Sequence, residues 1–307
     1  MRIGYIGLGK MGMGMVKLLL EKGHEVVATD PNEDARKEAE AAGAETVINL
    51  REFKEKLPGE KFIWIMVPHQ IVDTVLNDLG DVLNVGDVIM DGGNSNYNET
   101  VRRGAELKEK GLVFMDVGTS GGPSGARNGA CMMIGGARDK FEKYERLFKD
   151  LSVKDGYGYM GETGAGHYAK MVHNGIEYGM MQAIGEGFEI LKSSQFNLNL
   201  KDVTKIYNNG SVIESRLIGW LQKAYEEEGE DLDAISGEVS HSGEGQWTVE
   251  EAKNCRVDDN TTKQIPVPII EGALQFRIDS TGNPSYTGQV VSALRNQFGG
   301  HLVKKND

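Results

Sequence analysis

The chain has 307 residues, of which 39% are hydrophobic and 26% charged, and its formal net charge is -12. This length allows two domains of roughly 100–200 residues each. The acidic balance argues against a nucleic-acid partner, because binding a phosphate backbone requires a basic surface. No apolar run approaches the ~20 residues of a membrane helix, and no signal-peptide pattern precedes the first strand-like run. We therefore expect a cytoplasmic protein without a membrane partner.

The two cysteines, Cys131 and Cys255, have no neighbouring cysteine or histidine at metal-ligand spacing. Neither a metal site nor a disulfide framework is therefore expected, in keeping with a reducing compartment. Because free cysteine is commonly a small buried hydrophobe, both are predicted to be packing residues.

The first half of the chain alternates between strand-like and helix-like segments. Apolar strand-like runs occupy residues 2–8, 24–30, 62–68, 87–91, 113–117 and 131–135, and amphipathic segments occupy residues 10–22, 33–42, 70–79, 96–110 and 140–151. Such alternation predicts crossover units and a largely parallel sheet. The strands are apolar nearly throughout, as expected when both faces are covered. We predict an α/β Rossmann-type doubly wound domain over residues 1–164.

The pattern changes after about Gly164. Residues 166–192 form one long helix candidate without proline, with Gly175, Gly179, Gly185 and Gly187 in its interior. Because each glycine costs a helix up to about 1 kcal/mol, we expect close packing against another backbone in return. Further helices are expected at residues 202–208, 214–228, 249–254, 266–278 and 289–297. Residues 165–307 are therefore predicted to form an all-α domain for substrate binding and dimerisation.

A glycine-rich motif joins the first strand to the first helix: Gly7, Leu8, Gly9, Lys10, Met11 and Gly12 read G-x-G-x-x-G. In this context the glycines allow a tight turn, close approach to a pyrophosphate and close helix–strand packing. The helix N-terminus offers N–H donors to the phosphates. A glycine-rich turn without a ligand is the alternative. The methionines at positions 11, 13 and 15 are interpreted mainly as core packing.

Asp30 ends the second strand, about 20 residues beyond the glycines. A carboxylate there can accept hydrogen bonds from both adenine-ribose hydroxyls and would repel the 2′-phosphate of NADP, so it predicts NAD as the cofactor. Pro31 and Asn32 follow without an arginine beside them, while Arg36, one helical turn away, keeps NADP use open. The alternative for Asp30 is a helix N-cap or a turn residue.

Lys170, His173, Asn174 and Glu177 stand at i, i+3, i+4 and i+7, with Tyr178 beside them. This spacing places them on one face of a helix, although a solvated face is the alternative. Oxidising a secondary alcohol requires a base for the hydroxyl proton as the hydride leaves. A lysine can act so if burial lowers its pKa, and Glu177 can protonate an enediol at carbon if an apolar site raises its pKa.

Residues 166–178 (GHYAKMVHNGIEY) closely resemble the catalytic helix of 6-phosphogluconate dehydrogenases, and residues 116–136 (DVGTSGGPSGARNGACMMIGG) resemble the segment with their substrate-binding loop. Residues 91–95 (DGGNS), 243–248 (GEGQWT) and 292–301 (SALRNQFGGH) match further motifs in family order. The resemblance covers nearly the whole chain. It implies NAD-linked oxidation and decarboxylation of 6-phosphogluconate to ribulose 5-phosphate and carbon dioxide, a reaction of gluconate metabolism in the pentose phosphate pathway.

The resemblance also implies roles for individual residues. Lys170 would be the general base and Glu177 the general acid. The residues implied to bind the sugar acid and its phosphate are Asn94, Ser120, Gly121, Gly122, His173, Asn174, Tyr178, Thr248, Arg277, Arg295 and His301. The residues implied to bind the cofactor are the six of the glycine-rich motif together with Asp30, Val67 and Asn94. Independently, arginine suits phosphate because it binds in bidentate geometry, although lone arginines are more often surface residues.

The chain departs from the long members of the family in two respects. They have a lysine where this chain has Gln246, and they continue with a second helical repeat beyond the residue matching His301. The chain thus resembles the short form, which is often NAD-linked. In long members the residues matching Arg295 and His301 come from a neighbouring subunit. We therefore expect a homodimer or homotetramer with shared active sites, a monomer whose tail covers its own site being the alternative.

Two other functions stay open. Another β-hydroxyacid dehydrogenase, such as a 3-hydroxyisobutyrate or tartronate semialdehyde reductase-like enzyme, would share the glycine-rich start and the lysine helix. Glu177, Tyr178 and the motif ending at His301 favour a phosphorylated, decarboxylated substrate instead. A non-catalytic nucleotide sensor would not need Lys170 or Ser120. No metal is expected, because a β-keto acid can lose its carboxylate while Lys170 stabilises the developing oxyanion.

Overall fold

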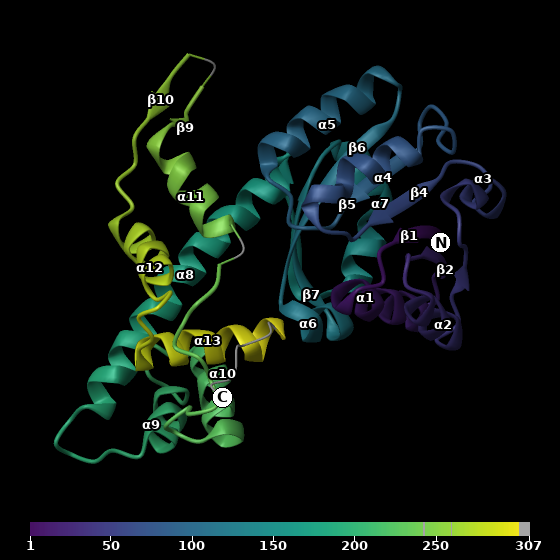
Figure 1. Ribbon diagram of the computed structural model, residues 1–307. Helices are drawn as coiled ribbons and strands as arrows, with labels where there is room; N and C mark the ends of the chain where they lie inside the picture. Colours follow the sequence, from purple (N-terminus) through teal and green to yellow (C-terminus); the bar gives the residue numbers. More distant parts are fainter. Residues whose placement is uncertain (242, 259, 301–307) are drawn as a thin grey trace. The chain divides into compact units, whose positions relative to one another are not determined.

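The computed structural model describes residues 1–241, 243–258 and 260–300 (Figure 1). The chain divides into two compact units, Met1–Met171 and Val172–Asp307. The division falls inside one unbroken helix, α8 (Ala165–Lys192). Within the described ranges, no helix is both long enough and apolar enough to cross a membrane.

The first unit contains an eight-stranded sheet in the order β3-β2-β1-β4-β5-β6-β7-β8. Neighbouring strands are parallel, apart from β6 and β7, which are antiparallel. The strands are β1 (Arg2–Ile6), β2 (Glu25–Thr29), β3 (Glu45–Thr46), β4 (Phe62–Ile65), β5 (Val88–Asp91), β6 (Val113–Ser120), β7 (Ala130–Gly135) and β8 (Ser152–Gly161). The predicted doubly wound α/β fold is confirmed.

Two strands, β3 and β8, were not predicted. β3 has only two residues. β8 lies at the edge of the sheet and has no fully buried residue. Its sequence therefore lacks the apolar run by which the inner strands were recognised.

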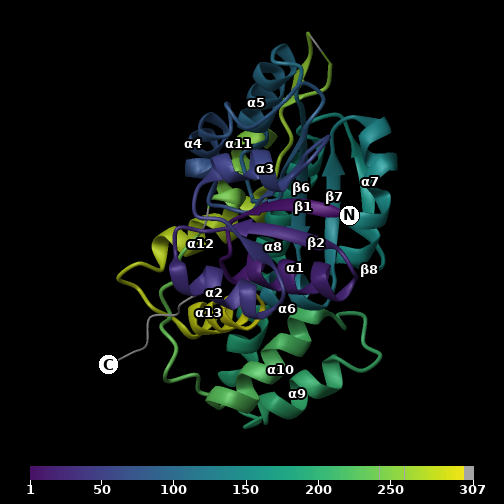
Figure 2. The same ribbon diagram turned by 90° about the vertical axis from the view of Figure 1, so that its right-hand side faces the viewer.

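Helices cover both faces of this sheet, as the sides of Figure 2 show for α7 and for α3 and α4. One apolar core includes Trp64 and the inner faces of α1, α6 and α7, and the other includes Ile63 and the inner faces of α3, α4 and α5. Neighbouring residues of one strand, Ile63 and Trp64, are thus both fully buried on opposite faces. The helices are α1 (Lys10–Glu21), α2 (Glu33–Ala41), α3 (Phe53–Lys56), α4 (Val72–Asp78), α5 (Tyr97–Glu109), α6 (Gly122–Asn128) and α7 (Arg138–Leu151), with short 3-10 turns at Leu50–Glu52 and His69–Ile71.

The second unit is helical around a single apolar core. Its elements after α8 are α9 (Leu200–Tyr207), α10 (Arg216–Glu228), α11 (Glu244–Lys253), α12 (Pro268–Asp279) and α13 (Tyr286–Gly299). The all-α expectation needs one addition, because β9 (Cys255–Arg256) and β10 (Thr262–Lys263) form a small antiparallel hairpin. Strands of two residues leave no recognisable pattern in the sequence.

The predicted close packing of the α8 glycines against another backbone is confirmed only in part. A Cβ on Gly175 would lie 2.6 Å from Thr248 Cγ2, and one on Gly185 would lie 3.0 Å from Thr287 Cγ2. The close neighbours are largely side chains rather than backbone. Gly187 differs, because a Cβ there would meet nothing within 4 Å.

The prediction that both cysteines are buried was wrong. Cys131 is exposed and Cys255 is partly exposed. Cys131 lies in β7, where its neighbours Ala130 and Met132 are each 1% exposed. Because alternate residues of a strand point to opposite faces, burial of these two neighbours leaves Cys131 on the other face.

Candidate active site

The glycine-rich loop between β1 and α1 is shaped by close contacts. Gly7 has a φ of 101°, and a Cβ there would lie 2.3 Å from the Met66 carbonyl oxygen. A Cβ on Gly12 would lie 2.0 Å from the Gly7 carbonyl oxygen, whereas one on Gly9 would meet nothing within 4 Å. Gly7 and Gly12 are therefore needed for packing. Gly9 leaves open space at the positive end of the α1 dipole, where a phosphate group fits.

Asp30 is held against this loop. Its Oδ2 accepts a hydrogen bond from the Leu8 N–H at 2.7 Å, and its Oδ1 accepts one from the Asn32 N–H at 2.8 Å. The N-cap of α2 is Asn32 rather than Asp30. Because each carboxylate oxygen has a second lone pair, Asp30 can still accept bonds from ribose hydroxyls. Arg36 donates to the carbonyl oxygens of Asp30 at 2.6 Å and Pro31 at 3.1 Å, which restrains its guanidinium.

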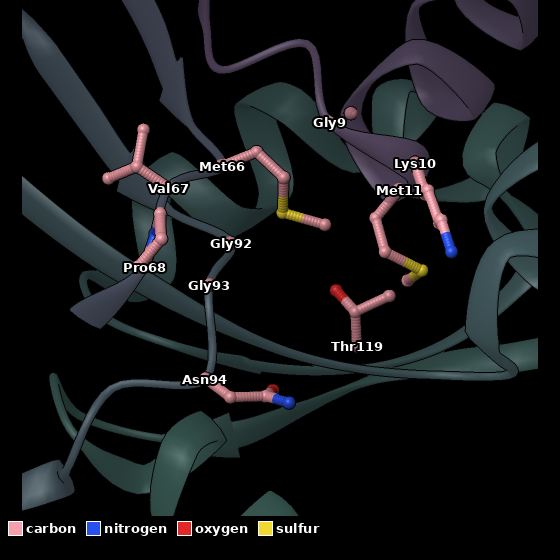
Figure 3. A pocket seen from close by; sticks show the side chains of 11 residues that line it. Gly9, Lys10, Met11, Met66, Val67, Pro68, Gly92, Gly93, Asn94 and Thr119 are labelled. Atoms are coloured by element: carbon pink, nitrogen blue, oxygen red, sulfur yellow. The ribbon is translucent and has the colours of Figure 1, made fainter. Parts of the chain in front are cut away.

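A cavity of about 270 Å³ lies at the carboxyl ends of β1, β4, β5 and β6 (Figure 3). This edge includes the point between β1 and β4 where the strand order reverses, which is where doubly wound sheets bind ligands. Six residues predicted to bind the cofactor line the cavity: Gly9, Lys10, Met11, Gly12, Val67 and Asn94. Five others were not predicted: Met66, Pro68, Gly92, Gly93 and Thr119. Their common signal is that each lies at or just after the carboxyl end of a strand.

The glycine loop also borders a wider hollow of about 730 Å³, lined in part by Met13, Asn32 and Arg127. All three methionines near the motif pack in or against the first core, as predicted. Met11 and Met13 additionally border the two hollows, whereas Met15 is fully buried.

Asn94 lies on a turn that is stabilised by hydrogen bonds to the buried carboxylate of Asp91. Asp91 Oδ1 accepts from the Gly93 N–H at 3.0 Å, and Asp91 Oδ2 accepts from the Ser95 hydroxyl at 2.6 Å. Arg103 Nη1 lies 4.0 Å from Asp91 Oδ2. These contacts fix the backbone on both sides of Asn94, whose side chain is exposed at the cavity.

The loop Ser120, Gly121 and Gly122 connects the end of β6 to α6. Gly121 has a φ of 121° and Gly122 a φ of 61°, values that disfavour any side chain. The turn leads into the N-terminal end of α6, where backbone N–H groups have no partner within the helix. The role of this loop in holding a carboxylate stays a prediction.

Lys170 is 6% exposed and lies where α8 starts against the sheet. A Cβ on Gly118 would lie 2.3 Å from Lys170 Cβ, and a Cβ on Gly166 would lie 2.4 Å from the Met133 carbonyl oxygen. The first turns of α8 therefore rest directly on β6 and β7. This burial meets the condition that a catalytic lysine be largely removed from water.

A buried aspartate anchors the start of α8. The Asp116 carboxylate accepts from the backbone N–H groups of Gly164 and His167, each at 2.7 Å. Burial raises the pKa of Asp116, while His167 and the two backbone donors act in the opposite direction. Asp116 was not predicted as a functional residue, and its hydrogen bonds fix the turn that precedes Lys170.

The second unit contains the remaining predicted residues of α8. His173 Nδ1 lies 3.0 Å from Asn174 Oδ1 and 3.7 Å from Glu177 Oε2. All three side chains are partly buried. A fully solvated helix face is therefore not what the structure shows.

Arg277 and Arg295 form a buried cationic cluster beside Tyr178. Arg277 Cζ lies 3.3 Å from the centroid of the Tyr178 ring, and the two arginines are 2% and 8% exposed. Burial lowers the pKa of Arg277 to about 10, and the charge of Arg295 acts in the same direction. Burial likewise lowers the pKa of Arg295. The alternative of two surface arginines was therefore wrong.

This cluster has no direct ion pair among the described residues, and the carboxylates that act on it from further away are Glu177, on both arginines, and Glu244, on Arg295. In the part of the chain that the structure describes, neither Arg277 nor Arg295 forms an ion pair with a carboxylate, and Arg277 Nη2 forms no hydrogen bond. Arg295 Nη1 donates to the Ser240 hydroxyl at 2.8 Å. Buried charges are normally paired, so the cluster has the character of an anion-binding site.

Three predicted positions remain. Thr248 is 5% exposed and its hydroxyl donates to the Glu244 carbonyl oxygen at 2.9 Å. Gln246, where long family members have lysine, is exposed and donates to Glu250 at 2.8 Å. His301 lies outside the described residues. Within residues 1–241, 243–258 and 260–300, no group of three or more His, Cys, Asp or Glu side chains could hold a metal ion.

The doubly wound sheet with its glycine-rich loop defines a nucleotide-binding dehydrogenase. Residues 2–173 match the family model of the NAD binding domain of 6-phosphogluconate dehydrogenase. Residues 166–195 and 192–307 match the model of the 6-phosphogluconate dehydrogenase C-terminal domain. The chain belongs to the 6-phosphogluconate dehydrogenase family of oxidoreductases.

Individual relatives agree with this assignment. YqeC of Bacillus subtilis (strain 168), which is provisionally named a 6-phosphogluconate dehydrogenase, is 48% identical over 99% of this chain and 100% of its own length. An NAD(+)-dependent, decarboxylating 6-phosphogluconate dehydrogenase of Haloferax volcanii is 40% identical over 100% of both chains. Among solved structures, Plasmodium falciparum 6-phosphogluconate dehydrogenase superposes with a TM-score of 0.81 at 28% identity, covering 92% of this chain and 62% of that one. That enzyme is described with its cofactor NADP+ and with its substrate 6-phosphogluconate.

Proposed function

We propose that this chain oxidises and decarboxylates 6-phosphogluconate to ribulose 5-phosphate and carbon dioxide, with NAD as the oxidant, in the cytoplasm. The observation that carries the proposal is the buried pair Arg277 and Arg295, which has no carboxylate partner among the described residues. A phosphate group would neutralise this pair and could accept bidentate bonds from it. A hydroxy acid without a phosphate would leave both charges buried without a direct ion pair, offset only by the more distant carboxylates of Glu177 and Glu244.

Two residues of α8, Lys170 and Glu177, have separate roles in the proposed reaction. A nicotinamide held in the cavity lined by Gly9, Val67 and Asn94 would supply the hydride acceptor for C3 of the sugar acid. Lys170 takes the proton of the C3 hydroxyl at the same time, and its ammonium then faces the new carbonyl oxygen. When the C1–C2 bond breaks and carbon dioxide leaves, the bond electrons move toward this oxygen, which Lys170 protonates. Glu177 then gives a proton to the former C2 while Lys170 takes back the proton of the C3 hydroxyl, so that the enediol becomes the ketone ribulose 5-phosphate.

A direct assay separates this function from the alternative of another β-hydroxyacid dehydrogenase. NADH formation would be measured with 6-phosphogluconate, gluconate and 3-hydroxyisobutyrate, with carbon dioxide measured in parallel. We expect turnover of 6-phosphogluconate with equal amounts of NADH and carbon dioxide. Preference for an unphosphorylated acid, or NADH without carbon dioxide, would contradict the proposal.

The cofactor preference is expected to depend on Asp30. In the double variant Asp30→Ser, Pro31→Arg, the ratio of kcat/KM for NADP to that for NAD should rise by about tenfold or more, because a carboxylate opposite the 2′-phosphate is replaced by a cation. Both cofactors would be compared in steady-state assays at fixed 6-phosphogluconate. Pro31→Ala alone serves as the control for loop structure. A wild-type enzyme that works better with NADP than with NAD would disprove the role of Asp30.

We also propose that the enzyme is a homodimer or homotetramer. The second unit exposes apolar side chains along α8 and α12: Ile176 is 54%, Met180 45% and Ile269 71% exposed. A Cβ on Gly179, between Ile176 and Met180, would lie 3.1 Å from Ile269 Cγ2, so these side chains form one surface. Covering such a surface with a second copy removes it from water.

Mixing two inactive chains tests whether the active sites are shared. If Arg295 served the site of a partner, hybrids of Lys170→Ala and Arg295→Ala chains would contain one intact site and regain part of the activity. We expect verified hybrids to regain part of the activity, because the proposal assigns Arg295 to a site shared between subunits. No recovery would mean that each site is built from a single chain.

A further inference from the structure

Thr119 holds a buried hydroxyl group without a partner in the described part of the chain. The residue lies one position before the end of β6 and is 5% exposed, and its Oγ1 forms no hydrogen bond there. A buried hydroxyl without a partner costs about 1–3 kcal/mol, and buried polar groups in native proteins are nearly always satisfied. The position therefore indicates a partner that the chain itself does not supply.

The cavity at the carboxyl edge of the sheet has room for that partner. Thr119 lines it, and Figure 3 shows the hydroxyl oxygen pointing into the cavity on the side of Met66. Much of the remaining lining consists of the side chains of Met11, Met66 and Val67 and of glycine backbone. Thioether sulfurs make favourable contacts with aromatic rings. The cavity thus fits a flat, largely apolar ring with one polar substituent.

The strand order determines which half of a dinucleotide reaches this cavity. Asp30 follows β2, on one side of β1, whereas Thr119 ends β6, beyond β4 and β5 on the other side. A dinucleotide that places its adenine ribose at Asp30 and its pyrophosphate on the glycine loop extends its nicotinamide ring toward β4, β5 and β6. Because side chains alternate along a strand, Thr119 and its neighbour Ser120 face opposite sides, so Ser120 is left for the sugar acid.

We propose that Thr119 Oγ1 forms a hydrogen bond with the carboxamide group of the bound nicotinamide ring and thereby fixes the rotation of the ring in the cavity. A carboxamide offers both an N–H donor and a carbonyl acceptor, and a hydroxyl can pair with either. The inference rests on the proposed function, since it requires a nicotinamide cofactor. It makes Thr119 a second determinant of cofactor binding, acting at the opposite end of the cofactor from Asp30.

Calorimetric titration of two variants with two nucleotides tests the proposal. Thr119→Val keeps the shape of the side chain without the hydroxyl, and Thr119→Ser keeps the hydroxyl. ADP-ribose is the matched probe, because it is NAD without the nicotinamide ring. We expect Thr119→Val to bind NAD about tenfold more weakly, the upper range for one hydrogen bond, and to bind ADP-ribose with wild-type affinity. Thr119→Ser should stay within about threefold of wild type for both nucleotides.

The thermal midpoint of Thr119→Val without a nucleotide should equal or exceed that of wild type, because the variant no longer buries an unsatisfied hydroxyl. Three results would overturn the proposal: unchanged NAD affinity in Thr119→Val, equal losses for NAD and ADP-ribose, or a raised KM for 6-phosphogluconate with NAD affinity intact. The last result would place the hydroxyl at the sugar acid. A wild-type protein that binds neither nucleotide would instead reject the proposed function, and the inference with it.

Discussion

Replacing Lys170 by alanine is expected to lower kcat for 6-phosphogluconate oxidation by about 10³-fold, with the affinity for NAD unchanged. Lys170 is the buried amine at the start of α8, and no other group is proposed to take the C3 hydroxyl proton. The nucleotide loop is separate from it in sequence, and its contacts with Asp30 do not involve Lys170. Single-turnover NADH formation and NAD titration would measure the two effects.

Two further variants sharpen this test. Lys170→Arg keeps a positive charge but cannot accept a proton near neutral pH, so it should be nearly as inactive as Lys170→Ala. Glu177→Gln should slow the steps after oxidation, so that NADH forms faster than ribulose 5-phosphate. Activity of Lys170→Ala within tenfold of wild type would remove the lysine from the mechanism.

The second large effect is expected at Arg277. Arg277→Met should lower kcat/KM for 6-phosphogluconate by about 10²–10³-fold, because a bidentate, charge-assisted contact with phosphate contributes roughly 3–4 kcal/mol. The same variant should leave the free energy of unfolding unchanged or raise it. In the unliganded protein Arg277 is a 2% exposed cation without a direct ion pair among the described residues. An apolar side chain of similar length removes the cost of burying that charge.

Ligand-induced stabilisation provides the control for this variant. Inorganic phosphate should raise the thermal midpoint of the wild-type protein but not that of Arg277→Met. Arg138→Met, at an exposed guanidinium that pairs with Glu142 at 2.8 Å, should behave as wild type in both assays. If Arg277→Met lost activity equally toward gluconate and 6-phosphogluconate, Arg277 would not be a phosphate ligand.

The fold could largely be predicted because the local sequence patterns match the burial and position that each segment has in the structure. The inner strands are buried on both faces, so Phe62–Ile65 is a continuous apolar run, and the glycine-rich motif follows directly on β1. The elements that could not be predicted are a strand at the edge of the sheet and strands of only two residues. The edge strand β8 is half exposed, and the hairpin of β9 and β10 contains two residues in each strand.

For the site, the sequence predicted which residues lie on the same helix or strand. It did not predict which of them are buried. Spacing along α8 placed Lys170 and Glu177 on one helix, as observed. The burial of Arg277 and its stacking on Tyr178 depend on the packing of α12 in the second unit, which no local pattern reports. Thr119 was overlooked for the same reason: its hydroxyl becomes unusual only when the surrounding strands leave it without a partner.

Some of the most constrained positions of this enzyme contain no functional group at all. At Gly118 and Gly166 the first added carbon would enter the space of the Lys170 Cβ or of the Met133 carbonyl oxygen. In a library of all single substitutions selected for activity, both positions should therefore be as intolerant as Lys170. A search for functional positions that considers only reactive side chains would miss these two glycines. Engineering of this scaffold for other hydroxy acids should accordingly vary the lining of the phosphate cluster and keep fixed the small residues on which the lysine helix rests.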